Sequence, residues 1–144
     1  MGIADILFQR NKEKAAKNLQ AGLDFLEANK SKPNVVALES GLQYEVLIEG
    51  DGPQPTASSS VTCHYHGTTI DGKVFDSSVQ RGTPATFPLN RVIPGWTEGV
   101  QLMKQGSKYK FYIPPHLAYG DRQVGSHIAP NSTLIFEVEL LAIQ

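Results

Sequence analysis

The chain of 144 residues lacks several features that would assign it to a functional class. Its one cysteine, Cys63, cannot form an intramolecular disulfide, which fits a reducing compartment or a fold that needs no disulfide. Its 13 basic and 14 acidic residues give a formal net charge of -1, with no electrostatic footprint for nucleic acid or an anionic membrane. Residues 1–8 lack the basic and apolar regions of a signal peptide, and no apolar run is long enough to span a bilayer. We therefore expect a cytoplasmic protein with no nucleic-acid or membrane partner, although a processed mature chain would look the same.

The signatures of covalent, phosphate and metal chemistry are also missing. The sequence contains no G-x-S-x-G, no Walker loop, no H-E-x-x-H and no C-x-x-C. His64 and His66 would share one face of a strand and could chelate a metal, but an ordinary site has three or four ligands. Cys63 is out of phase with them and is expected to face the core as a small hydrophobe. We expect neither a metal nor a cofactor.

A long helix is predicted at the beginning of the chain. Residues 3–29 contain no proline and are rich in good helix formers, and Pro33 cannot continue the helix. Apolar residues recur along it at steps of three and four: Ala15, Leu19, Leu23 and Leu26. This stripe would pack either on the rest of the chain or on a second copy, and the sequence favours neither.

After Gly41 the pattern becomes that of strands with one short helix. Strands are predicted by alternation and composition over these ranges: 43–49, 61–66, 108–113 and 133–143. Asp71-Gly72 is a hairpin turn signal, and residues 94–105 are predicted to form a short helix that Gly106 would stop. The prediction is an α+β fold, in which a curled antiparallel β-sheet wraps over one short helix and an N-terminal α-helix precedes it. The predicted domain organisation is a helical arm and linker over residues 1–40, followed by one domain over residues 41–144.

Aromatic and apolar residues gather at predicted strand ends and turns, where they would converge on an apolar cavity with one carboxylate. That carboxylate belongs to Asp76, which follows Phe75. One interpretation is an Asx turn or a surface charge. The other places Asp76 at the cavity wall, where it would accept hydrogen bonds from Tyr65 and Arg81. Such a cavity suits a reaction that needs desolvation more than a nucleophile.

Several ordered blocks carry a family resemblance: 61–67, 71–78, 92–96, 118–120 and 134–141. Their sequences are VTCHYHG, DGKVFDSS, VIPGW, AYG and LIFEVELL. Together they resemble the FKBP-type peptidyl-prolyl cis-trans isomerases over residues 41–144. The preceding helix and the junction at residues 40–44 are similar to the bacterial macrophage infectivity potentiator subgroup, whose N-terminal helical regions dimerise. The helical arm of this chain is shorter.

The resemblance implies rotation about X-Pro bonds of polypeptides, assistance to protein folding, and binding of macrolides such as rapamycin in the same pocket. It implies no cofactor, and a possible homodimer through the N-terminal helix. The alternative is a non-catalytic module or chaperone that captures proline-containing chains. A hydrolase that uses Asp76 with a histidine and a serine is a third possibility, but no nucleophile motif supports it.

The resemblance also implies site residues, with Trp96 as the floor beneath the proline ring. The residues implied to be catalytic are Tyr65, Phe75, Asp76, Trp96, Tyr119 and Phe136. Those implied to bind substrate are Arg81, Phe87, Val92, Ile93 and Ile128, the last of which lies in an overhanging loop over residues 121–131. Asp76 would orient the twisting amide without acting as a base.

Overall fold

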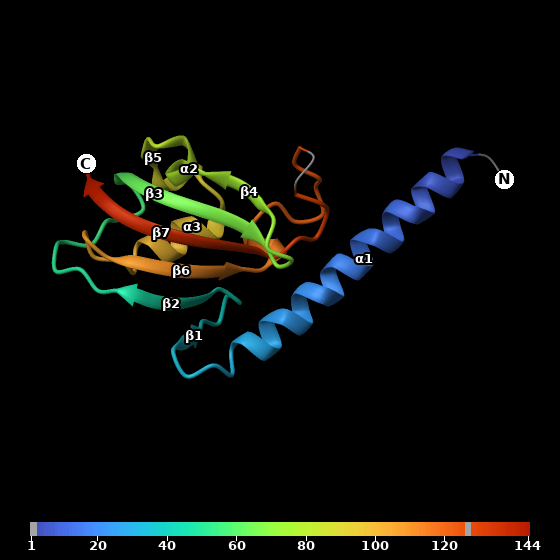
Figure 1. Ribbon diagram of the computed structural model, residues 1–144, viewed down its shortest axis with the longest axis horizontal. Coiled ribbons are helices and arrows are strands. Elements are labelled where there is room, and N and C mark those ends of the chain that lie inside the picture. Colours follow the sequence, from blue (N-terminus) through green and yellow to red (C-terminus); the bar gives the residue numbers. More distant parts are fainter. Residues whose placement is uncertain (1–2, 126–127) are drawn as a thin grey trace.

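The computed structural model describes residues 3–125 and 128–144, and it shows a long helix that leads into a curled antiparallel sheet (Figure 1). The helix, α1 (Ile3–Asn29), has the predicted bounds. Among the described residues, no helix contains an apolar stretch long enough to cross a membrane.

The sheet has strand order β1-β2-β6-β7-β3-β4, and β5 also pairs with β3. Every pairing is antiparallel. The strands are β1 (Val35–Ala37), β2 (Gln43–Ile48), β3 (Ser60–Thr69), β4 (Val74–Ser77), β5 (Ala85–Pro88), β6 (Lys108–Ile113) and β7 (Leu134–Ile143). The predicted α+β fold is confirmed, and β6 has the predicted bounds. The segment expected to be a linker contributes β1, which lies at the edge of the sheet.

Short helical elements join the strands: α2 (Ser78–Arg81), η1 (Leu89–Arg91), α3 (Pro94–Val100) and η2 (Pro115–Leu117). The prediction that the central helix continues to residue 105 was wrong. Tight turns replace α-helical bonds after Val100, because the Leu102 and Met103 amides donate to carbonyls only three residues back. Gly106, at a φ of 94°, ends these turns and not the helix itself.

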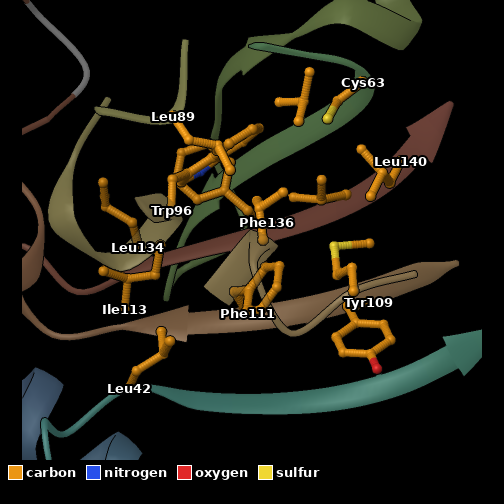
Figure 2. Close-up of a cluster of buried hydrophobic side chains, with 14 of the residues drawn as sticks. Leu42, Cys63, Leu89, Trp96, Tyr109, Phe111, Ile113, Leu134, Phe136 and Leu140 are labelled. Atoms are coloured by element: carbon orange, nitrogen blue, oxygen red, sulfur yellow. The ribbon is translucent and has the colours of Figure 1, made fainter. Parts of the chain in front are cut away.

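The core lies between α3 and the sheet, and it positions the residues discussed below. Alternate residues of β7, from Leu134 to Leu140, are buried, as their spacing predicts. Figure 2 shows Trp96 of α3, Leu89 of η1 and Phe136 of β7 pointing toward one another. Cys63 also faces the core, as predicted, and burial raises the pKa of its thiol to about 12.

α1 packs on the domain through a face that differs from the predicted stripe. Leu26 is buried, but Leu19 and Leu23 are 39% and 49% exposed. The face that contacts the domain includes Ala15, Asn18, Gly22, Phe25, Leu26 and Asn29, and the ring of Phe25 lies 6.0 Å from that of Tyr112 in β6. At the end of the helix the Asn29 side-chain amide donates to Gln43 Oε1 at 2.9 Å, and the Gln43 amide donates to the Leu26 carbonyl oxygen at 2.9 Å. The helix is therefore joined to the sheet partly by buried amides.

Candidate active site

An aromatic cavity of about 400 Å³ opens between the strands, η1 and α3. Its lining comprises Tyr65, Asp76, Phe87, Arg91, Val92, Ile93, Trp96, Tyr119 and Phe136. All of these except Arg91 were predicted. Two hollows beside α1 are larger, at about 480 and 510 Å³, but no described phenylalanine, tyrosine or tryptophan lines either of them.

The indole of Trp96 forms the floor of the cavity, because its side chain is 4% exposed and other rings stand around it. The rings of Tyr65 and Phe136 lie edge to face with it, at centroid distances of 5.5 and 5.3 Å and interplanar angles of 87° and 89°. Phe87 approaches at 5.1 Å. Each such pair contributes about 0.5–1.5 kcal/mol beyond its buried area. The floor is thus a preformed and rigid apolar surface.

Gly67 of β3 makes room for the rings behind this floor. A Cβ atom at residue 67 would lie 2.7 Å from Phe75 Cζ and 2.8 Å from Phe136 Cε1. The two phenylalanine rings pack edge to face at 5.3 Å. Phe75 therefore supports Phe136 without lining the cavity.

Asp76 lies at the cavity wall and accepts hydrogen bonds from Tyr65 and Arg81, as the second of the two interpretations predicts. It is not an isolated surface charge. The Tyr65 hydroxyl donates to Asp76 Oδ2 at 2.8 Å, and Arg81 Nη1 donates to Asp76 Oδ1. Arg81 Nη2 also donates to the Tyr65 hydroxyl oxygen at 2.9 Å. The three side chains close a ring of hydrogen bonds, so the carboxylate has a fixed orientation. Arg81 acts from outside the cavity lining.

The two tyrosines at the cavity remain hydrogen-bond donors at neutral pH. Burial is the largest cause that raises the pKa of Tyr65, and the charge of Asp76 adds to it. The pKa of Tyr119 is raised by burial and then by Asp76. No described residue bonds the Tyr119 hydroxyl or accepts from the Ile93 N–H, while the Ile93 carbonyl accepts from Trp96 and Thr97. The cavity therefore offers two donors that have no partner within the described parts of the chain.

Ile128 was predicted to line the cavity and does not, whereas Arg91 was not predicted and does line it. Ile128 is 6% exposed, belongs to the core cluster and is held to Val124 by two backbone hydrogen bonds. Arg91 is exposed at the end of η1 and lines the cavity. One signal in the sequence could have indicated that Arg91 lines the cavity, which is its position just before Val92 and Ile93.

His64 and His66 lie on the opposite face of β3, away from the cavity. Their Nδ1 atoms lie 2.9 Å from Ser78 Oγ and Ser77 Oγ. Glu139 and Glu137 of β7 stand across from them in the register. Over residues 3–125 and 128–144, no three histidine, cysteine or carboxylate side chains are grouped as metal ligands.

Known families match both parts of the chain. The family described as "FKBP-type peptidyl-prolyl cis-trans isomerase" matches residues 52–141, and the "domain amino terminal to FKBP-type peptidyl-prolyl isomerase" matches residues 3–46. The chain belongs to the FKBP-type isomerase family. The aromatic cavity lies within the matched isomerase region, and the family resemblance of the sequence is confirmed.

Relatives of the FKBP type extend over nearly the whole chain. The isomerase FkpA of Aeromonas hydrophila is 57% identical over 130 residues, which are 90% of this chain and 48% of that protein. The outer membrane protein MIP of Legionella longbeachae is 50% identical over 143 residues, which are 97% of this chain and 61% of that protein. The crystal structure of FkpA from Escherichia coli superposes with a TM-score of 0.91 at 45% identity, over 94% of this chain and 63% of that one. The chain therefore spans about half to three fifths of the length of these two curated relatives.

Proposed function

We propose that this chain is an active peptidyl-prolyl cis-trans isomerase that accelerates rotation about X-Pro bonds of polypeptides and so assists protein folding. The observation that carries the proposal is the cavity floored by Trp96, with rings on its sides and one oriented carboxylate at its wall. Membership of the family supports the same activity.

An apolar cavity suits this reaction because of what happens to the amide during rotation. The planar amide is stabilised by donation of the nitrogen lone pair to the carbonyl, and rotation costs about 18–20 kcal/mol. Twisting ends the resonance and reduces the charge separation, so a dry cavity favours the twisted form over the planar one. The rate increase then comes from tighter binding of the transition state. Neither a nucleophile nor a proton transfer is needed.

The polar groups of the cavity would orient the substrate. The Ile93 N–H, which donates to no described residue, is suited to hold one substrate carbonyl, and the Tyr119 hydroxyl is suited to hold another. Asp76, held by Tyr65 and Arg81, would face the twisting amide with its charge already balanced. Because these groups are in place before substrate arrives, little reorganisation accompanies the reaction.

A protease-coupled assay on a prolyl tetrapeptide, with and without rapamycin, tests the proposal. We expect the chain to accelerate cis-to-trans conversion, and rapamycin to abolish the acceleration by filling the same cavity. The alternative function, a binding module or chaperone, predicts that proline-containing peptides bind in calorimetry while the rate stays at the uncatalysed value. That result would overturn the enzyme proposal and retain the binding site.

Self-association through α1 is also part of the proposal. Leu19 and Leu23 are exposed, and together with Leu26 they line the hollow of about 480 Å³ beside the domain. A second copy of the helix could cover this apolar surface.

A cytoplasmic location remains a proposal from the sequence, and cell fractionation tests it, since one relative is named an outer membrane protein.

A further inference from the structure

α1 lies against the end of the loop that connects η2 to β7. Figure 1 shows the described parts of this loop, in orange and red-orange, between the sheet and the middle of the helix. The Asn18 side-chain amide donates to the Pro130 carbonyl oxygen at 3.0 Å. In the other direction, the Asn131 side-chain amide donates to the Ala15 carbonyl oxygen at 3.2 Å. The helix and the end of the loop are therefore joined by two reciprocal hydrogen bonds.

A third contact shows that the helix approaches this segment closely. A Cβ atom at Gly22 would lie 2.3 Å from Thr133 Oγ1, so a larger residue there would push the helix away. Ala15, Asn18 and Gly22 follow one another at steps of three and four and share one face of the helix. One face of α1 thus contacts Pro130, Asn131 and Thr133.

The same segment is bonded to the backbone beside Tyr119. The Asn131 N–H donates to the Gly120 carbonyl oxygen at 2.8 Å, and the Gly120 N–H donates to the Pro115 carbonyl oxygen at 2.8 Å. Asn131 adopts a φ of 59°, a left-handed conformation that asparagine tolerates better than most residues. Residue 120 is therefore held on both sides, and the adjoining Tyr119 lines the cavity.

We propose that Asn18 and Asn131 are positioning residues of the prolyl cavity, through which α1 keeps Tyr119 in place. This inference rests on the proposed isomerase function and assigns the N-terminal helix a part in turnover. When either amide is lost, residues 130 and 131 move more freely, and the Gly120 carbonyl loses a fixed partner. The Tyr119 hydroxyl then occupies its bonding position for a smaller fraction of the time.

Two variants of the full chain separate positioning from general stability. Asn18→Asp keeps the shape of the side chain but replaces the donor with an acceptor, and Asn131→Gly removes the amide while it still permits the left-handed φ. We expect each to lower kcat/KM by about three- to tenfold, the range for loss of one hydrogen bond. Gln20→Ala is the matched control, because Gln20 is exposed and its side chain bonds Asp24 of the same helix. Its kcat/KM should equal that of the wild type.

A double-mutant cycle with Tyr119→Phe tests the route. If α1 acts through Tyr119, adding Asn131→Gly to Tyr119→Phe should lower kcat/KM little further. The two single variants should also change kcat and KM in the same proportions as each other. Losses that multiply, or a Tyr119→Phe variant equal to the wild type, would overturn this route.

Hydrogen exchange of the Gly120 and Asn131 amides gives a readout that is independent of turnover. Both amides should exchange faster in Asn18→Asp than in Gln20→Ala, while core amides of β6 keep the wild-type rate. Unchanged exchange would contradict the positioning role. An inactive wild type would instead refute the proposed function, whereas an active wild type with equally active variants would refute only this inference.

Discussion

At the scale of single residues, the site separates desolvation from orientation. Trp96 is almost completely buried and supplies an apolar surface. Asp76 and Arg81 keep 44% and 51% of their side chains exposed, and an ion pair that is so exposed to water adds little to the stability of a fold. The hydrogen-bonded ring around Asp76 is therefore better explained by orientation of the carboxylate than by stability.

Arg91 leads to a prediction about substrate choice. Arg91 lines the cavity and has no salt bridge with a described residue, while the charge of Arg81 is balanced by Asp76. We expect peptides with a glutamate beside proline to be converted about two- to fivefold faster than those with a lysine, because an exposed charge pair contributes about 0–1 kcal/mol. Arg91→Gln should remove this preference and leave a neutral peptide unaffected. If the ratio of rates in the variant matches that in the wild type, Arg91 does not select the substrate.

At the scale of elements, the sequence predicts what local pattern controls. The bounds of α1 follow from a proline-free stretch of helix formers, and β6 follows from alternation. β1, β4 and β5 were missed because each has only three or four residues, too few for an alternating pattern to stand out. The contact face of α1 was missed because apolar periodicity does not reveal a face built on Gly22 and the amides of Asn18 and Asn29.

The exposed leucines of α1 predict self-association at the scale of this element. Leu19→Gln combined with Leu23→Gln should shift the chain toward the monomer, because the apolar surface left for a second copy is removed. Sedimentation equilibrium across a range of concentrations measures this shift, and Gln20→Ala again serves as the control. The idea of a helix-mediated dimer fails if the wild type is already monomeric at every concentration.

At the scale of the whole molecule, the predicted cavity depends on the closure of distant segments. The strand order places β3 between β7 and the pair β4 and β5, so Tyr65 meets Asp76, Phe87 and Phe136. The family resemblance predicted most of the lining. It did not predict Arg91 or the attachment of α1 to residues 130–133, since both depend on how this chain packs.

Buried titratable groups predict that the whole molecule loses stability at alkaline pH. Burial raises the pKa of the Cys63 thiol from 9.0 to about 12, and burial with Glu45 raises the pKa of Tyr112 from 10.0 to about 12. A raised pKa in the folded state stabilises the fold fully below the unfolded pKa, and this contribution is lost as pH rises toward 12. The free energy of unfolding should therefore fall above pH 9, by up to about 1.4 kcal/mol per pH unit for each group.

Urea unfolding at pH 8 to 11, followed by the fluorescence of Trp96, measures this loss under reducing conditions. Cys63→Ala should be less stable at pH 8 because of the cavity it creates, but its stability should decline less steeply above pH 9. Parallel declines for the wild type and the variant would show that the thiol does not contribute.

The catalysed rate of cis-trans interconversion on a prolyl peptide tests the central claim most directly, when wild type, Asp76→Asn and Trp96→Leu are measured side by side. Asp76→Asn keeps the shape of the side chain and removes its charge, and Trp96→Leu removes the rigid floor. We predict a clear acceleration by the wild type, a loss of about tenfold in Asp76→Asn and a larger loss in Trp96→Leu, where each factor of ten equals about 1.4 kcal/mol of transition-state stabilisation. A wild-type rate equal to the uncatalysed rate, or equal rates for all three proteins, would contradict the account.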